Sequence, residues 1–263
     1  MLEFWAKFLI TVKRHMYIAG GNSKMGALKD LWKLDLDREE WTRLEDMPGS
    51  KRYSFSMHLW KHFIIVFGGC PGNKSGLLND ILVYNIKNQK WIKNDKLMIK
   101  QGEFPKPRCR HGSNIISREN EIAEMFVFGG WHGIDDNGDK LKDVWKATFN
   151  FTQAGIFQIE WEKLDDMNTK AHRCFSFSIK DRTFLWGGFG NNLMKLQDIF
   201  GNVKIVTHDN LNLPPKWKED FRESKSIAGF GAVYDDLEQC LIVIGGGNIG
   251  KQNSPKHTNY ALG

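Results

Sequence analysis

Short uninterrupted runs of apolar residues recur along the chain, and each run ends in a pair of glycines. The five segments are Met16–Gly21, Phe63–Gly69, Met125–Gly130, Thr183–Gly188 and Leu241–Gly246. Counted between second glycines, the steps are 48, 61, 58 and 58 residues. A run of bulky residues without polar interruption predicts a strand that is buried on both faces. Its recurrence at a near-constant step predicts a repeat protein.

A second signature follows each glycine pair and consists of an aspartate, an aromatic strand and a spaced tryptophan. The pairs in the first three units are Asp30 and Trp41, Asp80 and Trp91, and Asp143 and Trp161. The separation is 11 residues in the first two pairs and 18 in the third, which predicts an insertion between about Asn150 and Gln158. The fourth unit repeats the pattern with a longer gap, from Asp198 to Trp217, and the fifth unit stops at Gly263 before a tryptophan.

A third signature, which contains an arginine, closes each unit and opens the next. The arginine is Arg52 at the first junction, Arg108 at the second and Arg173 at the third, whereas the fourth junction, around residues 226–230, lacks it. Each unit therefore predicts four strands: a short mixed strand, the apolar run, the aromatic strand, and a strand that begins at the recurrent tryptophan. Polar turn residues such as those at 88–89 fit a hairpin between the third and fourth strands.

This ordered set of signatures resembles the kelch repeat, and the resemblance covers nearly the whole chain. It implies an all-β fold, a kelch-type β-propeller of four-stranded antiparallel blades, whose sheets stack radially because none can bury both faces alone. We expect a single domain over residues 1–263 with four complete blades and a partial fifth. The expected blades are residues 4–50, 51–107, 108–171 and 172–223, with the partial blade at 224–263.

The two ends of the repeat pattern predict an incomplete ring. The resemblance implies that a closed propeller would take one strand from the opposite terminus. Here the first unit begins at its own first strand near Phe4, and the fifth unit has only two strands and the start of a third. We therefore expect that the chain is a piece of a propeller with at least five blades.

Composition and charge narrow the class of partner. The formal charge of +6 comes from 37 basic and 31 acidic residues that are spread along the chain, so we expect no nucleic-acid partner. No apolar run is long enough to span a bilayer, and the first residues do not form a signal peptide, so we expect no membrane partner. The four cysteines are far apart and unpaired in sequence, which predicts reduced thiols in an intracellular, cytoplasmic protein.

Candidate metal and enzyme chemistry is weak. Oxygen ligands at Asp135, Asn137 and Asp139 begin like a calcium loop, but Lys140 and Lys146 occupy the positions where glycine and glutamate are needed. His58 and His62 are four apart on strands or a turn, where they need not converge on one metal. Some propellers that resemble kelch units are copper oxidases, so an enzyme with a site in the axial funnel stays an alternative. We expect no cofactor, no metal and no enzymatic activity.

Binding is the favoured function. The resemblance implies that the loops after the glycine pairs and the junctions between blades form a partner surface, and the junctions are rich in basic residues that could bind an acidic peptide or a C-terminal carboxylate. The predicted partner-binding residues are Arg52, Arg108, Arg110, His111, Trp131, His132 and Arg173. The alternative is that the recurrent arginine pairs with acidic residues inside the propeller.

The predicted function is therefore a non-enzymatic protein-interaction module. By family analogy, one form of this function is the substrate-recognition part of a larger complex such as a ubiquitin ligase. Binding to actin or the cytoskeleton is a second form, because some kelch proteins bind actin. The sequence does not name the partner.

Overall fold

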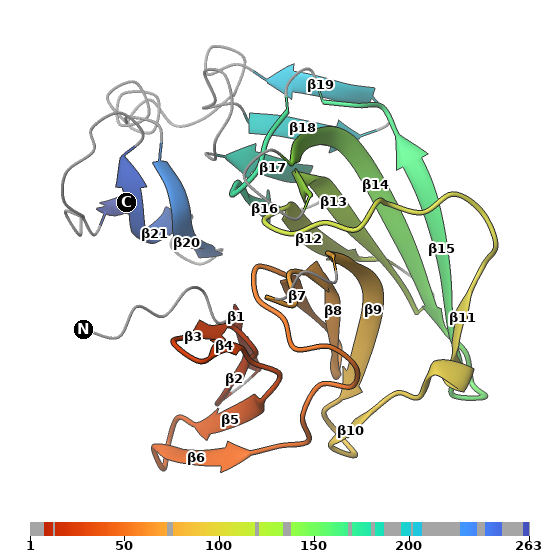
Figure 1. Cartoon of the computed structure of the whole chain (residues 1–263), viewed down its shortest axis with the longest axis vertical. Coiled ribbons are helices and arrows are strands. Elements are labelled where there is room, and N and C mark those ends of the chain that lie inside the picture. Colours follow the sequence, from red (N-terminus) through yellow and green to blue (C-terminus); the bar gives the residue numbers. More distant parts are fainter. Residues whose placement is uncertain are drawn as a thin grey trace.

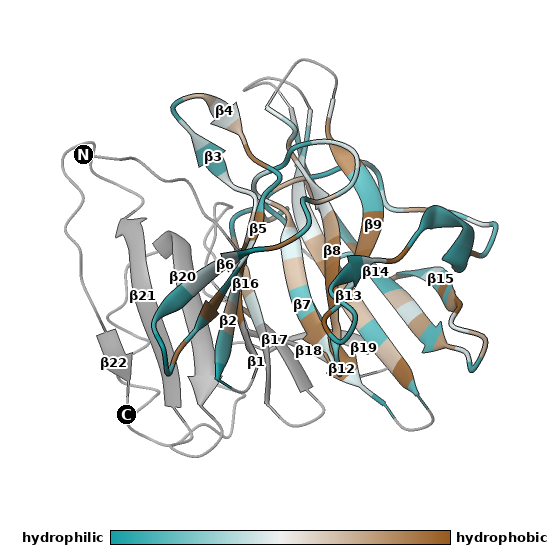
Figure 2. Ribbon diagram, turned by 90° about the horizontal axis from the view of Figure 1, so that it is seen from below, coloured by the Kyte–Doolittle hydropathy of each residue, from teal (hydrophilic) through white to brown (hydrophobic). Residues whose placement is uncertain are grey.

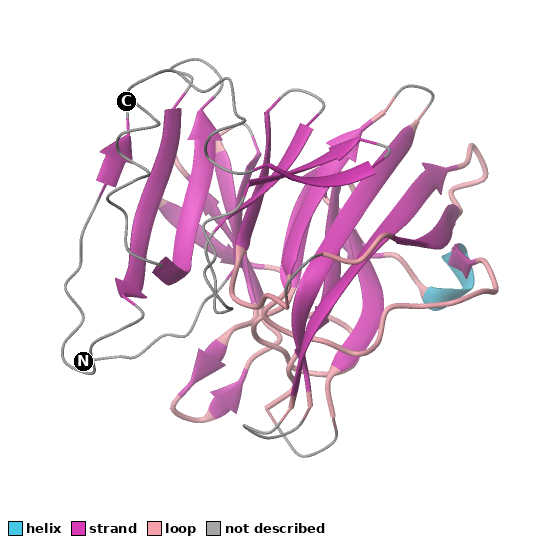
Figure 3. Cartoon of the chain, turned by 90° about the horizontal axis from the view of Figure 1, so that it is seen from above, coloured by secondary structure: helices cyan, strands magenta, loops and turns pink. Residues whose placement is uncertain are grey.

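The protein is an arrangement of small antiparallel sheets around one axis (Figure 1). The computed structural model describes residues 8–12, 14–72, 76–118, 121–133, 138–167, 170–179, 182–186, 196–200, 202–206, 227–235, 240–248 and 260–262. Strands dominate these residues, and a single 3-10 turn, η1 (Asn94–Lys96), interrupts them (Figure 3). The all-β propeller that the repeats predict is confirmed, with an incomplete ring.

The first two blades have four strands each. Blade 1 contains β1 (Phe8–Val12), β2 (His15–Ala19), β5 (Leu31–Asp35) and β6 (Glu40–Arg43), in that order from the axis outwards. A small hairpin of β3 (Asn22–Ser23) and β4 (Gly26–Ala27) lies between β2 and β5. Blade 2 contains β7 (Ser56–Trp60), β8 (Phe63–Gly69), β9 (Leu78–Asn85) and β10 (Lys90–Trp91).

Blade 3 has five strands. Its own four are β12 (Gly112–Ser117), β13 (Ile122–His132), β14 (Asp139–Phe151) and β15 (Phe157–Leu164). The fifth, β11 (Leu97–Ile99), comes from the segment that links blades 2 and 3 and pairs in parallel with the outer edge of β15. The expected insertion near 150–158 lengthens the β14–β15 hairpin, as predicted.

The last two units carry fewer described strands. The fourth consists of two antiparallel pairs, β16 (Phe175–Ile179) with β17 (Arg182–Trp186) and β18 (Leu196–Phe200) with β19 (Asn202–Val206). The fifth is a three-stranded sheet of β20 (Ile227–Asp235), β21 (Cys240–Asn248) and β22 (Tyr260–Leu262). The first strands of successive units, β1, β7, β12, β16 and β20, contact one another around the axis (Figure 1).

The core lies in the seams between neighbouring blades, and β8 shows why the apolar runs are uninterrupted. Because side chains alternate along a strand, Ile64 and Val66 pack against blade 1, whereas Phe63, Ile65 and Phe67 pack against blade 3. All five side chains have no exposed surface. Figure 2 shows apolar residues along the inner strands of the blades, such as β7, β8 and β13. Burying each such side chain stabilises the fold by about 1.5–3 kcal/mol.

The double glycines are needed because the backbone passes very close to its neighbours at these positions. Gly68 has a φ of +66°, and a Cβ built there would lie 2.9 Å from the carbonyl oxygen of Arg108. The next residue, Gly69, has a φ of +110° and equally crowded surroundings. Residues with a side chain rarely adopt positive φ, and a side chain would not fit here, so the glycine pairs have a structural role.

Candidate partner-binding face

The junctions between blades and the glycine-pair ends of the apolar strands meet at one end of the propeller. The N–H groups of Gly21, Gly69 and Gly130 donate to the carbonyl oxygens of Arg52, Arg108 and Ala171, at 2.8–2.9 Å. The first strand of each blade starts at this end, so the junction residues surround the opening of the central axis there. We call this opening the mouth. We call the surface formed by residues 50–55, 106–111 and 170–174 the junction face.

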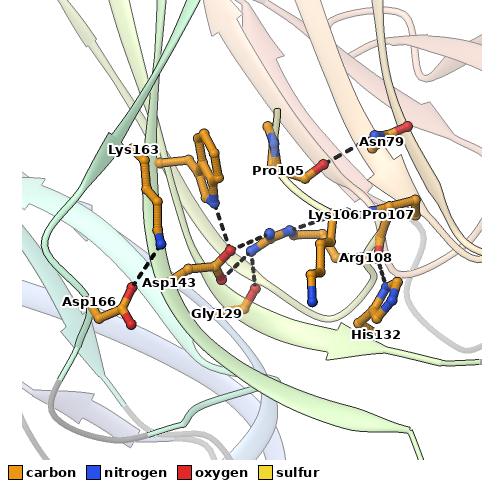
Figure 4. Close-up of polar contacts among 11 residues, drawn as sticks. Asn79, Pro105, Lys106, Pro107, Arg108, Gly129, His132, Asp143, Lys163 and Asp166 are labelled. Atoms are coloured by element: carbon orange, nitrogen blue, oxygen red, sulfur yellow. Dashed lines mark hydrogen bonds and ion pairs between the residues drawn. The ribbon is translucent and has the colours of Figure 1, made fainter. Parts of the chain in front are cut away.

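Arg52 and Arg108 lie inside the propeller. Neither side chain has exposed surface. The guanidinium of Arg108 donates two bonds to the carboxylate of Asp143, at 2.8 and 2.7 Å, and one to the carbonyl oxygen of Gly129, at 2.9 Å (Figure 4). Arg52 forms the same pattern with Asp80, with two bonds of 2.8 Å, and with Gly68. For these two residues the structure shows the internal ion pair that the sequence left as an alternative, and neither presents its side chain to a partner.

The pKa of Asp143 reflects this pairing. Burial would raise the pKa of this carboxyl, but the hydrogen bonds and charge of Arg108, with a bond from Trp145, outweigh burial and hold the pKa below its usual value. Asp80 and Asp143, which open the aromatic strands of blades 2 and 3, therefore neutralise the buried arginines of the preceding junctions. The regular place of this aspartate in the repeat was visible in the sequence, but its role was not assigned.

The third junction differs from the first two, and the sequence register assigned to it was wrong. The N–H groups of Arg52, Arg108 and Ala171 donate to the equivalent carbonyl oxygens of Leu28, Leu78 and Leu141. Ala171 thus occupies the buried arginine position, and Arg173 lies two residues further on. Arg108 and Arg110 are separated by a single residue, so either of them could be aligned with Arg173. The sequence alone therefore did not show that Arg173 corresponds to Arg110.

Arg110 and Arg173 occupy equivalent places beside the axis. Both have a φ of 56°, and Ser54 at the same place in blade 2 has a φ of 54°. Their backbones form a chain of hydrogen bonds around the mouth: Arg110 N–H donates to the oxygen of Ser54 at 2.9 Å, and Arg173 N–H to the oxygen of Arg110 at 2.6 Å. Both side chains are partly exposed. Of the predicted residues, these two are the basic groups that the structure brings together at the surface.

His111 joins the first strands of blades 2 and 3 at the axis. Its Nε2 lies 3.0 Å from the hydroxyl of Ser56, and the Nε2 of His58 lies 2.8 Å from the hydroxyl of Ser113, so two histidine–serine pairs cross the same seam. Burial, followed by the charge of Arg108, lowers the pKa of His111 to about 3, and burial lowers that of His58 to about 4. Both rings are therefore neutral at physiological pH.

Trp131 and His132 lie on the loop side of the junction face. The backbone of Trp131 pairs with that of Cys109, and its ring lies 5.4 Å from the ring of His172. The Nδ1 of His132 lies 2.6 Å from the carbonyl oxygen of Pro107 (Figure 4). Both side chains are partly exposed, so they border the mouth as predicted for partner contact, which itself stays a prediction.

Tyr53 and Cys70 also border the mouth and were not predicted. The thiol of Cys70 lies 3.2 Å from the hydroxyl of Tyr53. Burial, followed by this hydrogen bond, raises the pKa of Tyr53 to about 12, so the hydroxyl stays protonated. Their positions directly after Arg52 and Gly69 would have identified them once the junction register was known.

Several predicted features lie outside the described residues. These are most of the loop after each of the last two glycine pairs, Trp217 of the fourth unit, and Asp135 and Asn137 of the calcium-like segment. Among the described residues no three metal-binding side chains come together, and Cys70, Cys109 and Cys174 are free thiols. No helix in the described part of the chain is long and apolar enough to cross a membrane.

Comparison with known proteins agrees with the repeat and the propeller fold. The family model of the KLHDC2/KLHL20/DRC7 Kelch-repeats domain matches residues 5–188. This chain belongs to the kelch-repeat family. Its kelch repeats align with "Tip elongation aberrant protein 3" of Schizosaccharomyces pombe at 29% identity over 139 residues, which is 50% of this chain and 11% of that protein.

Other relatives carry the same repeats. "Kelch domain-containing protein 10" of Homo sapiens is 27% identical over 161 residues, 57% of this chain and 33% of that protein. "Host cell factor homolog hcf-1" of Caenorhabditis elegans is 26% identical over 205 residues, 68% of this chain and 24% of that protein. The kelch chain thus spans a third or less of the length of the curated relatives it matches.

Proposed function

We propose that this kelch chain is a protein-interaction module that binds an acidic group of its partner at the mouth of the axis. The observation that carries the proposal is the placement of Arg110 and Arg173 at equivalent, backbone-linked positions of neighbouring blades. Kelch families are generally interaction modules, which favours binding over catalysis.

The electrostatics of the mouth support an anionic partner group. Burial, followed by the charge of Arg110, lowers the pKa of Arg173, so the two guanidinium groups lie close enough to repel each other. Arg108 is neutralised by Asp143, but Arg110 forms no ion pair with a carboxylate of the described residues. A carboxylate placed between Arg110 and Arg173 would relieve this repulsion, and guanidinium groups bind carboxylates through two parallel hydrogen bonds.

The fixed backbone also favours binding. Non-glycine residues with positive φ are uncommon and cost about 1–2 kcal/mol each. Such conformations persist where the surrounding structure holds them, and they are frequent at ligand-binding sites. Arg110 and Arg173 both have such a backbone conformation. The direction in which each side chain extends from the backbone is therefore fixed before a partner binds.

The chemistry of the site fits an acidic peptide or the carboxylate at the end of a chain. Substrate recognition within a larger assembly, such as a ubiquitin ligase, is the specific form that we favour. Trp131 and His132 would then contact the residues next to the acidic group, because they border the same mouth.

The test is a double charge reversal, Arg110→Glu with Arg173→Glu. Partners are first captured with the full-length gene product and identified by mass spectrometry, and their binding to the variant is then measured. We expect binding to fall by about a hundredfold or more, since two charge-assisted contacts become repulsive, while the midpoint of thermal unfolding changes little.

A matched control reverses two charges at the opposite end of the propeller, in blades 1 and 2. Arg14 lies between β1 and β2, and Lys61 lies between β7 and β8, and both are exposed. The double variant Arg14→Glu with Lys61→Glu should bind partners normally. Equal loss in both double variants, or no loss in the first, would rule out the mouth as the binding site.

A further inference from the structure

The outer edges of blades 1 and 3 are equivalent in the fold but differ in what covers them. β15 is the fourth strand of blade 3, and its outer edge is covered by the added strand β11, which pairs through Leu97, Met98 and Ile99. β6 is the fourth strand of blade 1 and the last in the order of its sheet (Figure 1). The protein itself therefore shows that the perimeter of a blade accepts an additional strand.

The hydrogen-bond pattern shows which backbone groups of β6 point outwards. The N–H of Leu44 donates to the oxygen of Leu31 at 2.8 Å, so these two residues form a hydrogen-bonded pair. Hydrogen-bonded and non-hydrogen-bonded pairs alternate along antiparallel strands. The pairs of Arg43 with Trp32 and of Trp41 with Leu34 are therefore of the second kind. Their N–H and C=O groups on β6 face the outer edge, which no strand of the described residues covers.

A groove of about 440 Å³ lies beside this edge, between the end of β6 and the turn from β9 to β10. Its lining includes three basic residues, Arg43, Lys87 and Lys90, and one acidic residue, Glu45. Arg43 pairs with Asp46 at 3.0 Å and Lys90 with Glu45 at 3.8 Å, so a surplus of one positive charge remains at the groove. Its remaining polar side chains include those of Asn88 and Gln89. The lining therefore favours an anionic occupant.

The strand β6 is itself exposed and hydrophilic (Figure 2). Trp41 is the exception, because it is a large side chain with 51% of its surface exposed, on the strand whose edge is open. An added strand would cover this ring, and aromatic residues at such positions commonly act as anchors for a partner. Trp41 directly precedes Thr42, the first of the lining residues, so the edge and the groove adjoin on the perimeter, away from the junction face.

We propose that β6 and the groove beside it form a second binding surface, which takes an extended acidic segment of a partner protein as an added β-strand. The backbone groups of Trp41 and Arg43 pair with the segment. Its acidic side chains contact Arg43, Lys87 and Lys90. This mode of recognition is known as β-strand addition, in which main-chain hydrogen bonds give affinity and side-chain contacts give specificity.

The probe is a short fluorescent peptide of alternating valine and glutamate, blocked at both ends so that it has no terminal carboxylate. A peptide of alternating valine and lysine serves as the matched probe. Anisotropy titration of the full chain should show binding of the glutamate peptide and at least about tenfold weaker binding of the lysine peptide. Equal binding of the two peptides, or no binding of either, would overturn the proposal.

Two sets of variants separate the charge from the backbone edge. Charge reversal of Arg43, Lys87 and Lys90 to glutamate should weaken the binding of the glutamate peptide by about tenfold or more. Trp41→Pro removes the outward N–H, whereas Trp41→Ala keeps it, and proline is tolerated on the solvent side of an edge strand. Binding should therefore be weaker in Trp41→Pro than in Trp41→Ala, with both variants folded by circular dichroism. Equal affinity in these two variants would exclude strand addition.

A last arm separates this surface from the mouth of the axis. In the variant Arg110→Glu with Arg173→Glu, the glutamate peptide should still bind, and the further substitution Trp41→Pro should weaken that binding. If the arginine variant loses the peptide, the peptide occupies the mouth, which supports the proposed function and overturns the second surface. Concentration-dependent dimerisation that Trp41→Pro abolishes would also overturn it, because the edge would then serve a second copy of the chain.

Discussion

The seam between blades 1 and 2 and the seam between blades 2 and 3 contain the same buried ion pair in different surroundings. Asp80, which pairs with Arg52, has 44% of its side chain exposed, whereas Asp143, which pairs with Arg108, has 17% exposed. Arg108 also donates from Nε to the carbonyl oxygen of Lys106, at 3.0 Å, while the Nε of Arg52 has no partner among the described residues. The second pair is therefore both drier and more completely hydrogen-bonded.

The second seam is also more extensively packed. The lengthened β14–β15 hairpin brings Phe157 to 4.7 Å from the ring of Phe63, in an edge-on contact, and to 6.0 Å from that of Trp60. The two histidine–serine pairs cross this seam as well. One repeat motif thus gives interfaces of different strength, because the insertion and the polar contacts differ between blades. The stability of the propeller should depend more on the seam between blades 2 and 3.

Among single substitutions, the largest expected effect comes from closing the narrowest space in that seam. Gly68→Ala would place a Cβ 2.9 Å from the carbonyl oxygen of Arg108, at a φ of +66°. We expect a loss of more than about 3 kcal/mol in the free energy of unfolding, since backbone must move as well as adopt a strained conformation. Urea denaturation measures this loss.

Gly155→Ala is the matched control, because Gly155 has a φ of +74° but no atom within 4 Å of the added Cβ. Only the conformational strain of about 1–2 kcal/mol applies there. Similar losses at both positions would show that the seam relaxes easily.

Breaking the ion pairs has an effect of similar or smaller size. Arg108→Met leaves Asp143 buried without its partner, and such a change costs about 3–5 kcal/mol. Arg52→Met leaves an aspartate that water can reach, so we expect a loss of about 1–2 kcal/mol, closer to that of an ordinary hydrogen-bonded pair. Denaturant titration of both variants compares the seams directly, and a larger loss for Arg52→Met would reverse their order.

The same comparison shows how far the sequence could lead. The apolar runs, glycine pairs and spaced tryptophans predicted the strands, because these residues fill or tighten seams wherever they occur. The sequence could not show that Arg108 is buried while Arg110 is partly exposed, because both are arginines two residues apart and only the backbone path distinguishes them. Nor could it predict β11, since three residues in a linker carry no periodic pattern that indicates pairing with β15.

Acid should weaken the seam between blades 2 and 3 through His58 and His111. The pKa of His58 is about 4 and that of His111 about 3, both below the ordinary value of 6.5. Between pH 6.5 and these values, the unfolded chain therefore binds more protons than the folded one. Their contribution is fully present above pH 6.5 and is lost as the pH falls towards 4. Each histidine contributes up to about 1.4 kcal/mol per pH unit, so we expect up to about 6 kcal/mol to be lost over this range.

Unfolding midpoints in urea from pH 7.5 to pH 4 measure this dependence. The variant His58→Gln with His111→Gln can keep a polar contact to each serine but does not titrate, so its midpoint should vary less over the same range. An unchanged slope in that variant would assign the acid sensitivity to other groups.

The smallest expected effect concerns the mouth and has the opposite sign. Arg110 is held at a φ of 56°, which a glycine adopts without strain. Arg110→Gly should therefore stabilise the fold by about 0.5–1 kcal/mol relative to Arg110→Ala, after the extra freedom of glycine in the unfolded chain is subtracted.

Ser54→Gly tests the same position in blade 2. If both glycine variants are more stable, the backbone of the mouth is strained in both blades. The arginine is then retained at a cost in stability, as expected of a residue that binds a partner rather than one that holds a seam together. If Arg110→Gly is instead less stable than Arg110→Ala, the Arg110 position is unstrained, and its conformation gives no support to a binding role.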